Sequence, residues 1–456
     1  MFRVYLRIIF LFFLLCVNAQ YVSFAQSKVD ECVELTGITF ALAGVPEYCQ
    51  CLIPEYKNDI IEYFTPYELT PQIDFVRELN QVHGIGSIAV ASLSQYIFIN
   101  DKGTICLSPE YNIDKVIGEW TESLVTDYIY HLNIFYKESK FHDFFVQHHN
   151  LYADIETGIN QLVNAIKEDW FNDFFGQQSF NINDIYIIPS IVNGPHNYSV
   201  DSAVIIGIAV DESGQIVISD DTQTILVHEL CHHFTGDLFH KYWHDFKKSA
   251  ENIHPYISDQ MSGIGYQDAY TVFLEWFNNL CVIMYLYETD NEYLNLYTNS
   301  LTLRGFIWLE RNIDFMRNFY NNRNIYRNIS DFMPQLVSFL NFVCSNFEYV
   351  KSEYEHSFPY IVNIFPSNSS DLQHVDEIVI TFSEPMSGSY GFLGCPKGTS
   401  PIPFFECEWL DDRHFKIKHI KEMINDDTVY GITLHPAFFV SKKYYKLNEN
   451  FANLTF

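Results

Sequence analysis

Basic residues are scarce in this sequence. Of its 456 residues, 27 are Lys or Arg and 57 are Asp or Glu, which gives a formal net charge of −30. Such a surface repels phosphate backbones, so we expect no nucleic-acid partner. Charged residues make up 18% of the chain and apolar residues 48%, which predicts a well-buried globular protein and not a disordered one.

Long apolar runs are also missing. No segment approaches the roughly 20 apolar residues that cross a bilayer, so we expect no transmembrane span. The run of residues 8–15 near the N-terminus is too short as well, and it follows Arg3 and Arg7. A basic start before a short apolar run is typical of an export signal.

Small residues after this run offer cleavage sites at Ala25 or Ala19. We expect an exported protein that is periplasmic, on the cell surface or secreted. A lipid anchor at Cys16 is less favoured, because Leu14 and Leu15 precede it where a lipoprotein site has small residues.

Paired CxxC units are absent, which excludes a cysteine zinc knuckle. Of ten cysteines, nine remain once Cys16 is removed, and this odd number requires at least one free thiol. Cys395 and Cys407 are close enough in sequence to pair. Cys49 and Cys51 are too close together for an easy bridge.

The patterning predicts an α+β chain of three segments: a signal peptide (1–25), a mostly helical domain with a small β-sheet (26–356), and an all-β sandwich (357–456). Apolar residues spaced by three and four predict helices over 116–135 and 151–175. β-Branched runs predict strands over 185–191 and 203–210. Alternating runs separated by turns predict the sandwich, over 377–382, 415–418 and 429–434.

A helix is expected from about residue 220 to 234. Asp220 and Gln223 are spaced to form a capping box at its start. A polar, histidine-rich stretch follows to residue 265, and a strongly apolar helix covers about 267–287.

The first of these helices contains the motif HExxH, as His228, Glu229 and His232. Positions i and i+4 share one helix face, about 5–6 Å apart, which lets two imidazoles bind one zinc ion. Glu229 lies beside the metal, where it can take a proton from an activated water and pass it to a leaving amine. The cofactor we expect is one Zn²⁺ per chain.

A catalytic zinc needs a third protein ligand, and two patterns compete. The metzincin pattern requires Gly and His where this chain has Thr235 and Leu238, and Met261 suggests a Met-turn only weakly. The gluzincin pattern takes a glutamate from a second helix. Glu275 fits, because a lone carboxylate in an apolar helix is costly unless paired or metal-bound.

Alternatives to Glu275 as the third ligand stay open: Glu251, Asp237, His240 and His244. His233 and Cys231 are each one step from a motif ligand, so we expect His233 to point away from the metal and Cys231 to lie in the core.

Peptidases of this type add a donor that stabilises the oxyanion. Candidates are Tyr198, His196, Tyr266 and Tyr270. We expect the strand predicted over 203–210 to be the sheet edge that pairs with an extended substrate.

The chain resembles two families. Residues 31–354 are similar to a bacterial family of exported, gluzincin-like proteins labelled only as a domain of unknown function. The similar stretches are 33–44, 132–136, 141–145, 149–152, the HExxH motif and Glu275. This resemblance implies a zincin-like metallopeptidase fold but no substrate.

The last hundred residues resemble bacterial Ig-like domains of the ITFSEPM type, through 380–386 and 430–434. Such domains are usually spacers or surface-binding platforms. The function expected is therefore zinc-dependent hydrolysis of a polypeptide substrate, with cell-surface or glycan contact through the Ig-like domain. Two alternatives remain: a zinc hydrolase of non-peptide amides, and a non-catalytic surface or glycan-binding protein with a decayed motif.

Overall fold

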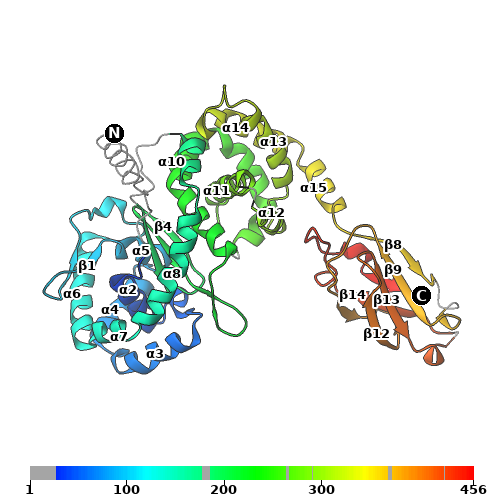
Figure 1. The fold of residues 1–456 in the computed structure, drawn as a ribbon, viewed down its shortest axis with the longest axis horizontal. Coiled ribbons are helices and arrows are strands. Elements are labelled where there is room, and N and C mark those ends of the chain that lie inside the picture. The colour runs from blue at the N-terminus through cyan, green and yellow to red at the C-terminus, as the bar shows by residue number, and fades with distance from the viewer. Residues whose placement is uncertain (1–26, 177–184, 263–265, 290, 368–371, 426) are drawn as a thin grey trace, which may run out of the picture. The chain divides into compact units, whose positions relative to one another are not determined.

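The computed structural model describes residues 27–176, 185–262, 266–289, 291–367, 372–425 and 427–456. The expected export signal lies outside these ranges. Within them, no helix combines the length and apolar character that crossing a membrane requires. The chain is α+β and forms two compact units, one up to Gly236 and one from Asp237 to Phe456 (Figure 1). The domain boundary expected near residue 357 stays a prediction.

The first unit is mainly helical and is organised around α2 (Glu31–Leu42). Residues 32–40 of α2 are all buried, and the Asp30 carboxylate caps the helix by accepting the backbone N–H groups of Cys32 and Val33. Helix α2 contacts α4, α5 and α7. The helices around it are α3 (Pro54–Phe64), α4 (Pro71–Gln81), α5 (Ser87–Ser94), α6 (Glu122–Glu138), α7 (Phe141–Gln147), α8 (His149–Ala165) and α9 (Glu168–Phe175).

A fully buried carboxylate joins α2 to the strand β3. Glu34 accepts hydrogen bonds from the hydroxyls of Tyr56 and Ser190, both at 2.7 Å, and from the Ile191 backbone N–H at 2.8 Å. Burial raises the pKa of Glu34. Gly37, one turn later, lets the chain approach closely, because a Cβ there would lie 2.2 Å from Val192 Cγ1.

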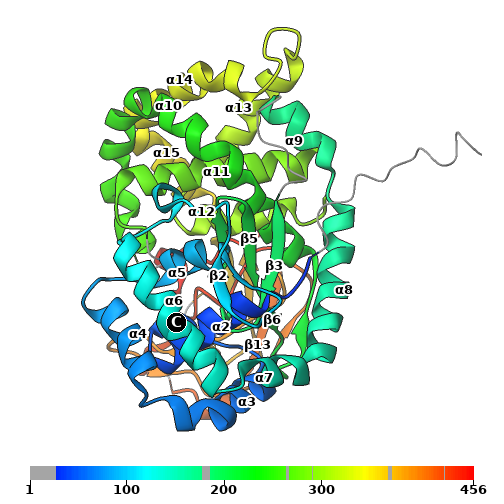
Figure 2. The same cartoon turned by 90° about the vertical axis from the view of Figure 1, so that its left-hand side faces the viewer.

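The main sheet of this unit has three strands in the order β3–β5–β4, and Figure 2 shows β3 and β5 side by side. Strand β3 (Tyr186–Ser190) runs parallel to β5 (Ala203–Gly207), and β4 (Tyr198–Val200) runs antiparallel to β5. Helix α8 contacts β3. Two hairpins complete the strands: β1 (Ile97–Ile99) with β2 (Ile105–Leu107), and β6 (Ala209–Val210) with β7 (Ile216–Val217).

Helix α10 (Asp220–Ser262) is far longer than the sequence predicted. The end expected near residue 234 is wrong, because buried residues continue at helical spacing: Leu238, Phe239, Phe246, Ala250, Ile253 and Ile257. The capping box predicted between Asp220 and Gln223 is also wrong. The Thr222 hydroxyl accepts the Ser219 N–H at 3.2 Å, whereas the Gln223 amide donates to the Leu162 carbonyl.

The second unit begins with the C-terminal part of α10 and adds an apolar helix, α11 (Ala269–Glu288). The two helices pack through aromatic rings, with Phe239 stacked on Phe277 at 6.1 Å and Phe246 edge-on to Trp276 at 6.0 Å. The Asp268 carboxylate caps α11. The remaining helices are α12 (Leu294–Leu303), α13 (Leu309–Asn321), α14 (Ile329–Ser345) and α15 (Phe347–His356).

From Ile361 onward the chain is built of strands, as expected. One sheet has the order β12–β13–β9–β8, and in the other β14 pairs with β10, β11 and β15. Side chains from both sheets share one hydrophobic core. The strands are β8 (Ile361–Phe365), β9 (Glu377–Phe382), β10 (Phe392–Gly394), β11 (Ser400–Pro401), β12 (Phe404–Trp409), β13 (His414–His419), β14 (Tyr430–Leu434) and β15 (Asn453–Thr455). The pairing of Cys395 with Cys407 is wrong, because both are free thiols.

Candidate metal centre

The two motif histidines converge on the face of α10. Their Nε2 atoms lie 3.1 Å apart, close enough for a hydrogen bond if one ring donates. Two nitrogen ligands about 2.0–2.1 Å from a tetrahedral zinc ion are themselves about 3.3 Å apart. The observed separation of the ring nitrogens therefore matches that of two ligands of one ion.

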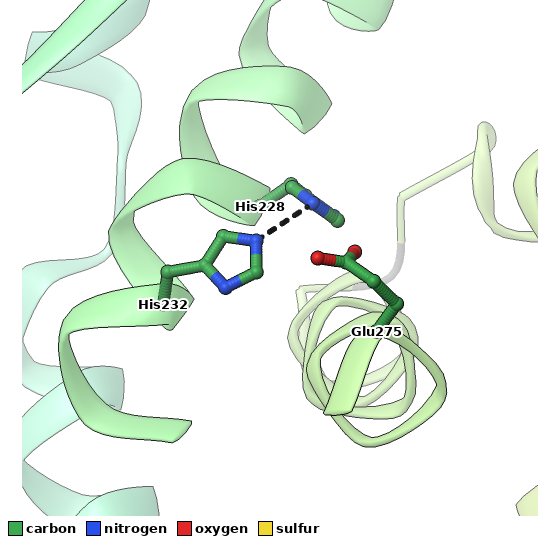
Figure 3. Close-up of side chains that lie close together, drawn as sticks. All are labelled: His228, His232 and Glu275. Atoms are coloured by element: carbon green, nitrogen blue, oxygen red, sulfur yellow. Dashed lines mark hydrogen bonds between the residues drawn. The ribbon is translucent and has the colours of Figure 1, made fainter. Parts of the chain in front are cut away.

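Glu275 of α11 approaches the same point from a second helix. Figure 3 shows its carboxylate directed toward the two imidazoles of α10. One ligand atom from each of His228, His232 and Glu275 lies within 4.8 Å of the others, and the group could hold a metal ion. In the part of the chain that the structure describes, no other group of three such side chains meets this description.

The surroundings of Glu275 explain why an ion suits it. The residue is only 8% exposed, and its neighbours on α11, Phe273, Trp276 and Phe277, are fully buried. A carboxylate in such a place is costly without a positive partner. Two imidazoles and one carboxylate are a donor set that Zn²⁺ accepts, with a fourth position left for water or substrate.

Glu229 follows the first ligand and is also 8% exposed. Its negative charge contributes to raising the pKa of two buried neighbours, Cys231 and Tyr198, in both of which burial is the larger cause. Cys231 is fully buried, as the sequence predicted. The buried carboxylate of Glu229 therefore lies on the same helix turn as the proposed ligands.

His233 does not belong to the metal-binding group. Its Nε2 atom lies 3.1 Å from the Ser199 hydroxyl of β4, so this side chain joins α10 to the sheet. Burial, and secondly the charge of His232, lowers the pKa of His233 to about 4. The ring is therefore neutral at pH 7, and sequence spacing alone did not reveal its partner.

The competing ligands lie elsewhere. Glu251 forms an ion pair with Lys247 at 3.7 Å, and His240 lies with Nδ1 3.5 Å from the Tyr270 hydroxyl. Asp237 and His244 are exposed on α10. The metzincin positions Thr235 and Leu238 continue the helix, and Met261 lies within α10 and not in a turn.

The four oxyanion candidates are spread over the chain. The Tyr198 ring packs with Val33 and Ala91, and its hydroxyl lies 3.4 Å from that of Ser87. His196 stacks on the Tyr198 ring at 6.4 Å. Tyr270 begins α11, and Tyr266 precedes it. An oxyanion role for any of them stays a prediction.

The predicted substrate-binding edge needs correction. Strand β5, within the run 203–210, is the middle strand of its sheet, and residues 209–210 belong to a separate hairpin. Within the described residues, β4 pairs with β5 alone. The sequence missed β4 because its three residues are too few for an alternating pattern to show.

Searches for related proteins add nothing to this geometry, since no protein-family model, no curated protein and no solved structure matches the chain.

Proposed function

We propose that this chain is an exported zinc-dependent metallopeptidase of the gluzincin type, with one Zn²⁺ bound by His228, His232 and Glu275. The observation that carries the proposal is the approach of these three side chains from two helices to within 4.8 Å. The zincin-like domain, its signal peptide and export belong to the same proposal.

The chemistry follows from the side chains. A zinc ion held there supplies Lewis-acid polarisation of a carbonyl and lowers the pKa of water. Glu229 takes the proton as the water oxygen bonds to the carbonyl carbon of the peptide. It then gives that proton to the amide nitrogen as the C–N bond breaks, which releases an amine and a carboxylic acid. Glu229 suits this role by its position, because it is only 8% exposed and directly follows His228 on α10.

The substrate would bind along β4. A strand that pairs on one side only can add an extended peptide through backbone hydrogen bonds. Ser199 of β4 contacts His233, the residue after a proposed ligand, which holds this strand beside the motif turn of α10.

The test is hydrolysis of a peptide library by the full mature chain, with one zinc per chain measured by elemental analysis. We expect a chelator to abolish hydrolysis and zinc to restore it. Glu229→Gln should keep the zinc and lose at least about a hundredfold in rate. Glu251→Gln, an exposed glutamate on the same helix, is the matched control and should keep full activity. Hydrolysis that survives Glu229→Gln would refute the mechanism, and cleavage of small amides alone would identify a non-peptide amidase.

A second candidate is a non-catalytic surface or glycan-binding protein with a decayed motif. It is favoured by exposed aromatic rings in the strand-rich C-terminal part of the chain, namely Tyr390, Phe404 and Phe438. We propose an Ig-like fold for this part, with a cell-surface or glycan-contacting role. A chain that binds glycan but no stoichiometric zinc would favour this candidate over the peptidase.

A further inference from the structure

A cluster of aromatic and polar side chains lies on α10 and the first turn of α11. The Trp243 and Tyr270 rings meet edge-to-face with centroids 5.0 Å apart. The Tyr270 hydroxyl lies 3.5 Å from His240 Nδ1. The ring of buried Phe239 packs against both, with its centroid 5.7 Å from that of Trp243 and 5.6 Å from that of Tyr270. Trp243 and Tyr270 are half-buried and His240 is exposed, so solvent reaches the rings.

Two carboxylates lie near this cluster. Asp237 precedes His240 by three residues on α10, so the two side chains share one helix face, and Asp268 precedes Tyr270 by two residues. Burial, and then the charges of Asp237 and Asp268, raises the pKa of Tyr270. The Asp268 carboxylate is engaged with the backbone N–H and the hydroxyl of Thr271, at 3.0 and 2.8 Å. Asp237 is exposed, and no ion pair involves it among the described side chains. Asp237 is therefore the acid able to meet a ligand.

Two of the three lysines of α10 contact other side chains. Lys241 Nζ lies 5.3 Å from the centroid of the Tyr242 ring, and Lys247 pairs with Glu251 at 3.7 Å. In these contacts neither lysine is paired with Asp237. Aromatic faces attract a cation within about 6 Å, and a carboxylate adds to this attraction. The net charge of −30 repels anions and favours the approach of cations.

The cluster precedes Glu275 along α11. Tyr270 precedes Glu275 by five residues, which is about 7.5 Å of helix. An extended peptide advances about 3.3 Å per residue, so this distance corresponds to two or three substrate residues.

We propose that Asp237, Trp243 and Tyr270 form a subsite for a lysine or arginine side chain of the substrate. The subsite rests on the proposed peptidase function, since it selects peptides with a basic residue two or three positions from the cleaved bond. His240 completes its rim. A neutral side chain would leave Asp237 without a partner, and an acidic one would be repelled.

The test is a binding measurement that needs no turnover. Zinc-loaded Glu229→Gln protein is titrated by calorimetry with short blocked peptides that differ only by Lys or Gln, scanned over the positions around the central bond. We expect the lysine peptide to bind about five- to tenfold more tightly at one position. Asp237→Asn and Trp243→Leu should each bring this preference within about twofold.

Asp245→Asn, an exposed acid on the same helix, is the matched control and should keep the preference. Equal binding of the two peptides at every position, or a preference that survives Asp237→Asn, would overturn the subsite. Hydrolysis by the wild-type chain is measured separately. Cleavage without a lysine preference refutes the subsite alone, whereas a lysine preference without zinc-dependent cleavage refutes the peptidase and leaves the cation subsite standing.

Discussion

Replacement of Glu275 by glutamine separates a metal ligand from a structural carboxylate. The substitution keeps the shape of the side chain and removes its charge, and the residue is only 8% exposed. If Glu275 binds zinc, the variant loses one of three ligands whose atoms lie within 4.8 Å of one another. The increase in melting temperature that zinc produces should then nearly disappear, whatever the substitution does to the metal-free chain.

The size of the effect follows from ligand linkage. Zinc at a hundred times its dissociation constant stabilises the wild-type chain by about 2.7 kcal/mol. A hundredfold loss of affinity at the same zinc concentration leaves about 0.4 kcal/mol. For a cooperative unit of about 200 residues, the wild-type shift corresponds to roughly 5–10 °C in calorimetry, and the shift of the variant to about 1 °C.

Glu251→Gln provides the control, because it removes an exposed carboxylate that pairs with Lys247. It should show the full wild-type zinc shift. A Glu275→Gln chain that zinc stabilises as much as the wild type would show that the carboxylate is not a ligand, and the proposed metal centre would then be refuted.

Three further predictions concern the first unit. Glu34→Ala should lower the free energy of unfolding by about 3–5 kcal/mol in urea, since three buried donors lose their acceptor; Glu34→Gln should cost less, because the Tyr56 hydroxyl can turn to accept. Burial raises the pKa of Glu34 above 4.5, so the folded chain binds the carboxyl proton more tightly than the unfolded chain does. The free energy of unfolding should therefore fall as the pH rises from about 4.5. A wild-type chain whose unfolding free energy has the same pH slope as that of Glu34→Gln would contradict this. Gly37→Ala should destabilise by about 1–3 kcal/mol because of Val192, and Val192→Ala should restore part of the loss in a double-mutant cycle; simple additivity would contradict the contact.

Local patterns predicted the element types well. The run 203–210 contains β5, residues 267–287 lie largely in α11, and the alternating run 377–382 is β9. These segments are long or strongly periodic, and burial of one face decides their conformation. The motif spacing also placed both histidines on one face of α10, since a helix turn fixes that relation without help from the rest of the chain.

The sequence did not predict contacts between residues that are far apart along the chain. Strands β3 and β4 are the two edges of the sheet, and β5 is its middle strand although it has the stronger strand pattern. This order depends on the pairing of β5 with β3, which lies apart from it in sequence, as well as with β4. Residues 235–262 have a polar composition because His240, His244 and most of the charged residues are exposed, while a narrower buried stripe continues the helix. The exposed face of such a helix contains more residues than its buried face, so the average composition of the segment is polar although the segment is helical.

Two glutamates show where sequence reasoning ends. Glu34 and Glu275 each lie in an apolar helix, and each is buried. The sequence indicated Glu275 as a ligand candidate but not Glu34, because only Glu275 follows the HExxH motif at a plausible distance. The structure shows the difference in the partners: Glu34 receives two hydroxyls and a backbone N–H, whereas Glu275 faces two imidazoles. Hydroxyl and amide groups can donate all the hydrogen bonds that a buried carboxylate needs. Two imidazoles can instead bind the same metal ion as the carboxylate. A buried carboxylate therefore indicates a metal site only when its neighbours are themselves able to bind the metal.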